Sequence, residues 1–242
     1  MSRPLVGARW EYLLYLSYRC PSGLLAPLVP AGTELDPWQG DHYLTLVGRY
    51  TRDTLVRGLA IPCHRDFEAV TLCFHVRRRD PGGAWRAGTV SIRELVPRRA
   101  IAALARRWFQ APALAVVMSN ANDLVDPRRG LVAYFWSVAR KKFSLVAGIA
   151  GPPADPLPDS HAAFVTRRPW GYARTRSAAT LEYRIAHPDW QVWIPEESSA
   201  EGPMHVVFGN SFAYLFTERP AAACVATGSA VSLERAQYFP GE

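Results

Sequence analysis

Long apolar runs, cysteine pairs and lysine are the features that this 242-residue chain has least of. No stretch approaches the roughly eighteen apolar residues of a membrane-spanning helix, so we expect no transmembrane segment and no membrane partner. The N-terminal stretch MSRPLVGARWEYLLYL does not combine a charged segment, an apolar core and a small-residue cleavage site, and it therefore predicts no signal peptide. The cysteines Cys20, Cys63, Cys73 and Cys224 lie far apart without a C-x-x-C pair. This spacing predicts reduced thiols in a cytoplasmic protein.

The net charge of +7 comes almost wholly from arginine, because Lys141 and Lys142 are the only lysines in the chain. The basic residues are dispersed, with denser groups at 77–79, 98–107 and 140–142. A nucleic-acid-binding protein usually concentrates its basic residues in one stripe and carries a recognisable motif, and neither occurs here. We therefore rank nucleic acid below the other partners considered.

Histidine and cysteine do not follow the spacing of metal sites. Zinc ligands usually come in close pairs such as C-x₂₋₄-C or H-x₃₋₅-H, and Cys63, His64, Cys73 and His75 form no such pair. The chain also lacks the G-x-S-x-G elbow of serine hydrolases. The sequence predicts no metal site and no cofactor.

The clearest local pattern is the stretch 89–108, TVSIRELVPRRAIAALARRW. Val90 and Ile92 alternate with polar residues, as in a half-buried strand. Pro97 then stands where a helix can begin, since proline lacks an N–H that would be unpaired there. Apolar residues recur at helical spacing after it and predict one apolar helix face. These residues are Ile101, Leu104, Ala105 and Trp108.

Short strands separated by turns account for most of the remaining chain. We predict strands near 10–18, 42–50, 69–77, 131–138, 143–147, 162–165, 180–186, 191–194 and 222–231, with short helical segments near 21–30 and 211–216. The strands 69–77 and 89–94 form an antiparallel hairpin, and 131–138 and 143–147 form a second. This pattern predicts a mainly β, antiparallel sheet curled into a barrel or sandwich. We expect one domain over residues 1–242, with a Pro-rich loop at 150–160, because neither half has enough strands to fold alone.

Several motifs in order along the chain resemble those of the YqjF-like family of uncharacterised proteins, domain of unknown function 2071. They are LVPAGTELDPWQGDHYLTLVGRY, GLAIPCHRDFEAVTLCFHV, IRELVPRRAIAALAR, FVTRRPWGY, LEYRIAHPDWQVW and ACVATGS. That family resembles the acetoacetate decarboxylase superfamily, which implies a closed, cone-shaped β-barrel with an internal pocket and a few short helices. Two motifs depart from the family pattern: TLCFHV stands where Asn-Leu-Arg-x-Tyr-Val is usual, and RRPWGY stands where Glu-His-Tyr-Trp-Gly-Tyr is usual.

The resemblance to the decarboxylases does not extend to their nucleophile. Those enzymes carry Arg-Glu before Pro-Lys-Lys, and the first lysine forms a Schiff base with the substrate. Here the corresponding run is Arg93-Glu94-Leu95-Val96-Pro97-Arg98-Arg99, and arginine stays protonated and cannot take this role. Lys141 and Lys142 lie one hairpin later, where a solvated turn is the simpler interpretation.

The candidate site residues follow from the resemblance and from strand alternation. Glu68 matches the pocket glutamate of the superfamily and would act as an acid or base; the alternative is a structural ion pair with Arg49 or Arg93. Adjacent strand residues face opposite ways, so at most one of Arg93 and Glu94 faces a pocket, and alternation groups Arg93 with Thr89 and Ser91. The expected catalytic residues are Glu68 and Arg93. The expected ligand-binding residues are Arg49, His75, Glu94, Arg98 and Trp136.

The leading functional hypothesis is a small organic acid or carbonyl compound bound in an internal barrel pocket. An enzyme of this kind would use a glutamate base for proton transfer or a lyase-like reaction in place of a Schiff-base lysine. A non-catalytic small-molecule sensor or partner-binding module is the competing hypothesis. The sequence leaves a homo-oligomer open.

Overall fold

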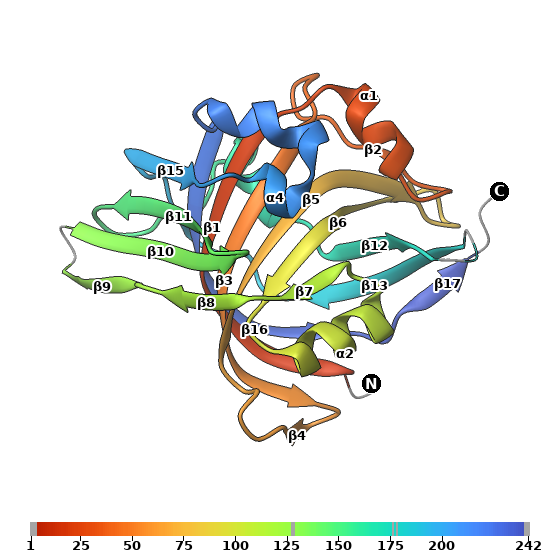
Figure 1. Cartoon of the computed structure of the whole chain (residues 1–242). Helices are drawn as coiled ribbons and strands as arrows, with labels where there is room; N and C mark the ends of the chain where they lie inside the picture. The colour runs from red at the N-terminus through yellow and green to blue at the C-terminus, as the bar shows by residue number, and fades with distance from the viewer. Residues whose placement is uncertain (1–3, 127–128, 176, 178, 240–242) are drawn as a thin grey trace.

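Two β-sheets form the body of the computed structural model, which describes residues 4–126, 129–175, 177 and 179–239 (Figure 1). The larger sheet contains β1 (Val6–Arg19), β2 (Glu34–Leu35), β3 (Tyr43–Val56), β4 (Leu59–Ala60), β5 (Phe67–Arg79), β6 (Trp85–Val96), β7 (Ala113–Ala115), β12 (Trp170–Arg174), β13 (Thr180–Ala186), β14 (Val192–Trp193), β16 (Ala222–Leu233) and β17 (Gln237–Phe239). The smaller sheet contains β8 (Val117–Asn120), β9 (Asp123–Asp126), β10 (Arg129–Val138), β11 (Lys141–Ile149) and β15 (Glu197–Glu201).

Short helices connect these strands. They are α1 (Ser22–Leu25), the 3₁₀ turn η1 (Ala26–Leu28), α2 (Arg99–Phe109), α3 (His161–Thr166), α4 (His205–Phe208) and η2 (Asn210–Thr217). In the described part of the chain, no helix is both long enough and apolar enough to cross a membrane.

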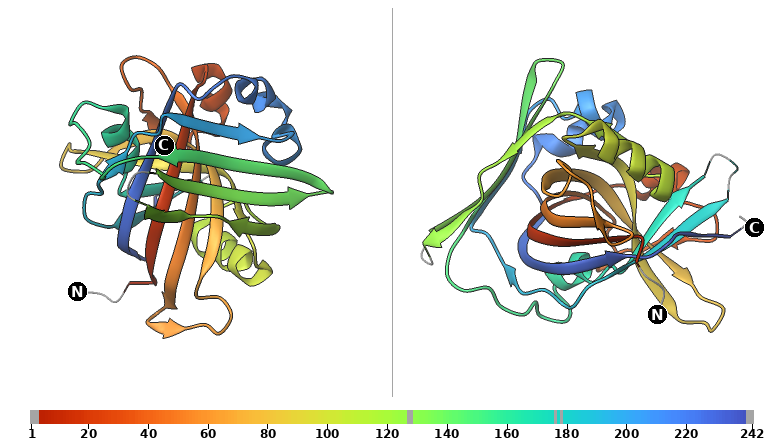
Figure 2. Two further views of the ribbon diagram at one scale, coloured as in Figure 1. Left: turned by 90° about the vertical axis from the view of Figure 1, so that its left-hand side faces the viewer. Right: turned by 90° about the horizontal axis from the view of Figure 1, so that it is seen from below.

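The larger sheet closes on itself. Its strands follow the order β16, β1, β3, β5, β6, β12 and β13, and β13 then pairs back onto β16 through Ile185 opposite Leu233. Neighbours in this ring are antiparallel except β6 and β12, which run parallel. The right-hand view of Figure 2 looks at the ring from below, the end at which α2 lies. The prediction of a mainly antiparallel, closing sheet with few short helices is therefore confirmed.

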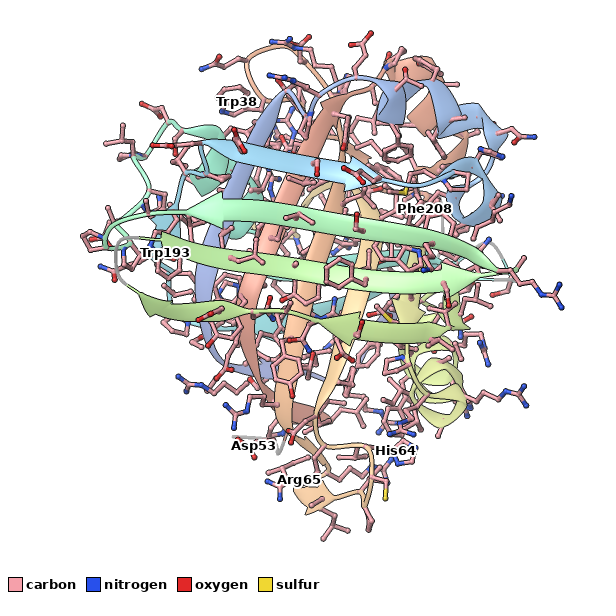
Figure 3. All side chains as sticks on the ribbon, turned by 60° about the vertical axis from the view of Figure 1, so that its left-hand side comes forward. Trp38, Asp53, His64, Arg65, Trp193 and Phe208 are labelled. Atoms are coloured by element: carbon pink, nitrogen blue, oxygen red, sulfur yellow. The ribbon has the colours of Figure 1, made fainter. Side chains whose placement is uncertain are left out.

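The main core lies between one wall of the ring and the smaller sheet, whose strands cross the long strands steeply in Figure 3. Alternation along β5 sends Val70, Leu72 and Phe74 into this core, as predicted, and each is fully buried. Gly48 on β3 allows the two layers to approach, because a side-chain Cβ there would lie 2.4 Å from the Tyr134 ring of β10. The opposite face of β5 looks into the ring.

Most predicted strands and both predicted hairpins are present. The segment 162–165 is an exception, because it belongs to the helix α3 and not to a strand. Ser160 caps this helix by accepting a hydrogen bond from the Ala163 amide at 3.2 Å. A short apolar run does not distinguish a strand from a buried helix, and the cap decides between them here. The Pro-rich loop runs from β11 to α3, and its Ala154 pairs with Val192 of β14.

The helix α2 carries the predicted apolar face but begins two residues later than Pro97. Arg98 occupies its N-cap in an extended conformation, and Gln110 ends it in a left-handed conformation before Pro112. Its buried residues Ala102 and Phe109 pack against the ends of β5, β6 and β13. This places α2 across the lower end of the ring.

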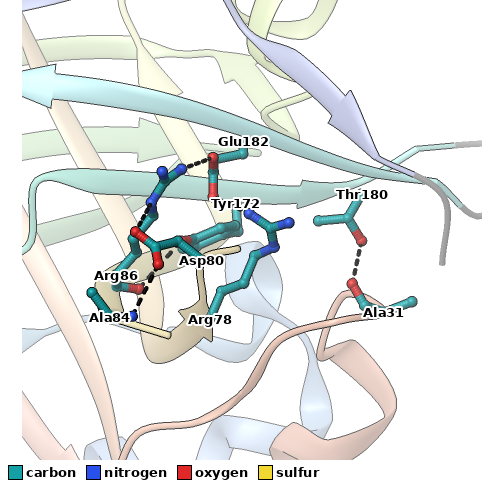
Figure 4. Close-up of polar contacts among 8 residues, drawn as sticks. All are labelled: Ala31, Arg78, Asp80, Ala84, Arg86, Tyr172, Thr180 and Glu182. Atoms are coloured by element: carbon teal, nitrogen blue, oxygen red, sulfur yellow. Dashed lines mark hydrogen bonds and ion pairs between the residues drawn. The ribbon is translucent and has the colours of Figure 1, made fainter. Parts of the chain in front are cut away.

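A buried carboxylate of β13 links this strand to β5 and β6, on the other side of β12 (Figure 4). The Glu182 side chain is only 5% exposed and accepts hydrogen bonds from Arg86 at 2.7 Å and from Arg78 at 3.2 Å. Tyr172 donates a hydrogen bond to the Arg86 carbonyl at 3.2 Å. Since β6 and β12 share only a short parallel pairing, this cluster adds a side-chain clamp across that part of the ring.

Candidate functional site

The interior of the ring contains a cavity of about 240 Å³. Strands β1, β3, β5, β6 and β13 line its sides, α2 lines its lower end, and the end of α3 lines the other side. The polar and ionisable side chains from these strands include Arg49, Thr71, Cys73, His75, Ser91, Glu94 and Tyr183. A concave site with a few polar groups on an otherwise apolar lining is typical of small-molecule binding.

An ion pair between Arg49 and Glu94 forms the polar centre of the cavity. The Arg49 guanidinium donates a hydrogen bond to Glu94 Oε1 at 2.5 Å and another to Thr71 Oγ1 at 3.1 Å. The two charged side chains are only 15% and 14% exposed. The indole of Trp10 lies 4.8 Å from the Arg49 guanidinium carbon, in cation–π geometry.

The Arg49 guanidinium retains capacity for a ligand. Arginine has five N–H donors, and Arg49 Nε is buried without a hydrogen-bond partner among the residues that the structure describes. A buried donor without a partner costs free energy until something accepts its hydrogen bond. A carboxylate or carbonyl oxygen entering the cavity would supply that acceptor.

A β-bulge decides which charged residue of β6 reaches the cavity. Leu72 pairs with Arg93 and Cys73 pairs with Ser91, so Ile92 is the extra residue on β6. Glu94, paired with Thr71, therefore shares the cavity face with Ser91, while Arg93 shares the opposite face with Leu72. The prediction from simple alternation that Arg93 lies on the face of Thr89 and Ser91 is wrong, because alternation holds only where the ladder is regular.

Glu68 also lies on the face of β5 that points away from the cavity. Its carboxylate accepts a hydrogen bond from Asn120 of β8 at 2.7 Å. Asn122 continues this network by donating to Asn120 at 3.2 Å. The ion pair considered for Glu68 with Arg49 is not formed, because Arg49 pairs with Glu94. A catalytic role for Glu68 stays a prediction, now without a place on the cavity wall.

The other predicted site residues divide between the cavity and the rest of the molecule. His75 lines the cavity with Arg49 and Glu94. Arg98 is exposed at the N-cap of α2. Trp136 is buried in the main core and stacks on Phe143 at a centroid distance of 5.3 Å. The structure thus brings together three of the residues expected from sequence and separates the others from them.

His75 ends a buried polar chain at the side of the cavity nearest α3. Its Nε2 lies 2.9 Å from Thr45 Oγ1, which in turn lies 2.9 Å from Ser17 Oγ. Burial lowers the pKa of His75 well below its ordinary value, and the charges of Arg168 and His161 lower it further. The imidazole is therefore neutral at physiological pH. Its Nδ1 is buried and, within the described residues, has no hydrogen-bond partner.

Arg168 brings a second positive charge to the cavity lining and is largely neutralised. Its guanidinium forms a short ion pair with Asp36, and its Nε donates to the Phe164 carbonyl at 2.7 Å. The Phe164 ring lies 3.8 Å from its guanidinium carbon. Because its side chain is only 6% exposed and has these partners, Arg168 acts mainly as a structural element that holds α3 against the ring.

Tyr183 closes the polar centre from β13. Burial and the nearby Glu94 raise the pKa of its phenol, while Arg49 opposes that rise, so the hydroxyl stays protonated at neutral pH. Gly171 on β12 provides space for the ring, since a Cβ at that position would lie 2.1 Å from Tyr183 Cζ. The Trp-Gly-Tyr motif therefore positions a hydroxyl-bearing ring against the cavity.

Sequence reasoning missed Thr71, Tyr183, Arg168 and Trp10. Thr71 could have been found, because it lies two positions from Cys73 on β5 and therefore on the same strand face. No local signal marks the other three, since they reach the cavity from different strands and from the end of α3.

Both lysines lie far from this site, at the turn of the β10–β11 hairpin, where they are exposed. Burial raises the pKa of the Cys73 thiol in the cavity wall to about 12, so this thiol stays protonated and is a weak nucleophile. In the described part of the chain, no group of three or more His, Cys, Asp or Glu residues is placed to hold a metal ion.

Comparison with known proteins gives one family match and several structural matches. The model of the family DUF2071, an uncharacterized conserved protein, matches residues 7–230. No curated protein matches the chain in sequence. An acetoacetate decarboxylase-like enzyme from Sphingomonas wittichii RW1 superposes with a TM-score of 0.66 at 14% identity, covering 100% of this chain and 95% of that one. The enduracididine biosynthesis enzyme MppR gives 0.71 at 12% identity, with coverages of 100% and 90%. Acetoacetate decarboxylase from Legionella pneumophila gives 0.67 at 12% identity, with coverages of 98% and 87%.

Proposed function

Because the chain belongs to the DUF2071 family and has the fold of acetoacetate decarboxylase-like enzymes, we propose that it binds a small organic acid or carbonyl compound inside the ring. The Arg49–Glu94 pair carries this proposal, since it places a buried guanidinium with an unpaired donor in the cavity wall. Arginine matches the geometry of a carboxylate and can donate two parallel hydrogen bonds to it. Tyr183 and His75 offer further polar contacts on either side.

Ligands of the structural neighbours support the same chemical class. MppR has been solved in complex with pyruvate and with the condensation product of pyruvate and imidazole 4-carboxaldehyde. A lysine Schiff base is not part of the function proposed here, because both lysines are exposed at a hairpin turn and arginines occupy positions 98 and 99. The polar end of the ligand would be held by hydrogen bonds and charge, without a covalent bond to the protein.

Glu94 is the residue best placed to add catalysis to binding. With a carbonyl oxygen held by Arg49, its carboxylate would remove a proton from the adjacent carbon. The C–H bond breaks, its electron pair enters the enolate, and Arg49 stabilises the enolate oxygen. The alternative is a binding protein without turnover, in which Glu94 only orients Arg49.

Thermal unfolding against a panel of keto acids, carboxylates, aldehydes and short oligonucleotides tests binding. A ligand at 100 times its dissociation constant adds about 2.7 kcal/mol to the free energy of unfolding, which corresponds to about 5–10 °C for a chain of this length. Arg49→Met should abolish the shift, whereas the matched control Arg52→Met, an exposed arginine on the same strand, should retain it. If Arg49→Met is too unstable to purify, Arg49→Lys keeps the charge but loses the planar donors.

Three outcomes would contradict the proposal. A shift caused only by oligonucleotides would favour nucleic acid as the partner in place of a small acid or carbonyl compound. Loss of binding in Arg93→Met but not in Arg49→Met would place the ligand on the other face of β6. If none of the acids and carbonyl compounds raises the unfolding temperature, the proposed ligand class is wrong.

Hydrogen exchange into the ligand distinguishes an enzyme from a binding protein. The protein and a bound keto acid are incubated in D₂O. Proton NMR then follows the loss of signal from the hydrogens on the carbon next to the carbonyl. Exchange that is lost in Glu94→Gln while binding persists would identify Glu94 as a catalytic base. Binding without exchange in the unmodified protein would identify a non-catalytic binding function.

A further inference from the structure

The apolar face of α2 is only partly buried, although it points into the molecule. Ile101, Leu104, Ala105 and Trp108 all line the cavity, and each keeps intermediate exposure. A helix of a globular protein normally buries such a face against its neighbours. Here the cavity lies against it, so apolar surface remains available inside the ring.

The facing strands are apolar at the same level. Val56 of β3 and Phe67 of β5 line this end of the cavity, beyond the polar centre. We call this end the apolar lobe and define it by Val56, Phe67, Ile101, Leu104, Ala105 and Trp108. Among the described residues that line the cavity, the charged ones are Arg49, Glu94 and Arg168, so none lies in the lobe. Its polar neighbours on β3, Thr51 and Thr54, are uncharged.

The lobe continues directly from the polar centre along the strands. On β3 the cavity-lining residues run from Arg49 through Thr51 to Val56, and on β5 they run from Thr71 back to Phe67. These strands are paired, with Arg49 opposite Ala69 and Thr51 opposite Phe67. A ligand whose polar group reaches Arg49 therefore has apolar walls on the side toward α2.

We propose that the natural ligand is an amphipathic acid or carbonyl compound, whose hydrocarbon tail occupies the apolar lobe while its oxygen atoms contact Arg49. This inference rests on the function proposed above and narrows its ligand class. A compound as short as pyruvate would leave the lobe uncovered. Each methylene group buried in the lobe should strengthen binding about four-fold.

A homologous series of straight-chain carboxylates and the matching 2-oxo acids, from about four to ten carbons, measures the lobe directly. Titration calorimetry gives the dissociation constant of each, and tryptophan fluorescence, to which Trp108 in the lobe contributes along with the other seven tryptophans, provides a second signal of binding. We expect affinity to rise about four-fold per methylene until the lobe is filled. Short acids that bind with no gain along the series would overturn this inference and leave the proposed function standing. Binding by no member would overturn both.

A substitution that fills part of the apolar lobe distinguishes binding of the tail from binding of the polar group. Ala105→Leu should weaken binding of the longest acid about sixteen-fold, equivalent to about two displaced methylenes, and leave the shortest acid within about two-fold. Ala103→Leu makes the same change on the exposed face of α2 and is the matched control. If the Ala105→Leu variant does not fold, Ala100→Leu takes its place, because Ala100 also lines the cavity but is exposed. Equal weakening of short and long acids would contradict a tail in the lobe.

Discussion

Replacing His161 with phenylalanine should remove about 2 kcal/mol of the stability that the fold loses between pH 8 and pH 5. His161 opens α3, is only 9% exposed, and lies between the rings of Trp38 and Tyr43 at centroid distances of 5.0 and 4.7 Å. Burial, and then the charge of Arg168, lowers the pKa of His161 from 6.5 to about 4. Its Nε2 has no hydrogen-bond partner in the described structure. Phenylalanine keeps the ring contacts and cannot be protonated.

The direction follows from proton binding. The pKa of His161 is lower in the folded chain than in the unfolded chain, so the unfolded chain binds more protons at pH values between them. The stability contributed by the neutral ring is present above about pH 6.5 and is lost as pH falls toward 4. Between pH 8 and pH 5 the loss is about 2 kcal/mol, and the complete loss is about 3 kcal/mol.

Urea unfolding of the unmodified protein and of His161→Phe at pH 8 and pH 5 tests this value. Both proteins share their other titrating groups, so the difference between their two losses of stability isolates His161 and its repulsion of His75. We expect the variant to lose about 2 kcal/mol less than the unmodified protein on acidification. His205→Phe, at an exposed position, is the matched control. Equal losses in the unmodified protein and in His161→Phe would refute a buried, neutral His161.

Three further predictions concern the clamp, the positioning of the site and the thiols. Glu182→Gln should lower the free energy of unfolding by about 3 kcal/mol, because two arginines lose their shared carboxylate; calorimetric unfolding would show it, and an unchanged midpoint would contradict a structural clamp. Gly171→Ala should cost about 1–3 kcal/mol by crowding Tyr183, and ligand titration should show weaker binding than in Gly88→Ala, the control for a crowded strand glycine. Alkylation at neutral pH should label the exposed Cys63 rapidly and the three buried cysteines only on unfolding; mass spectrometry of timed samples would show uniform labelling if the burial is wrong.

The bulge at Ile92 determines which residues of β6 are worth mutating. It moves Glu94 into the cavity beside Arg49 and turns Arg93 away. Strand alternation alone would direct mutagenesis to Arg93, whose expected catalytic role stays a prediction without a place on the cavity wall. The informative pair is Arg49 and Glu94, and a double variant of the two should show a strongly non-additive effect on stability, since each removes the partner of the other.

Local patterns in the sequence determined the strands, the two hairpins and the apolar face of α2. Side chains alternate along β5 and recur every three or four residues along α2 because the backbone geometry imposes these periods, so neighbouring residues contain the information. The absence of lysine outside 141–142 likewise excluded a Schiff base at the position of the resemblance. These properties depend on residues that are close together in the chain.

Only the tertiary structure decided which side chains meet in the cavity. Arg49 and Glu94 are 45 positions apart, and their contact depends on the register of three strands and on one extra residue in β6. Tyr183 and Arg168 enter from β13 and the end of α3, whose helical state depends on its cap. The closure of β13 onto β16 brings these segments around one interior. Register, bulges and closure arise from long-range pairing free energies that no local window contains, and the site follows from them.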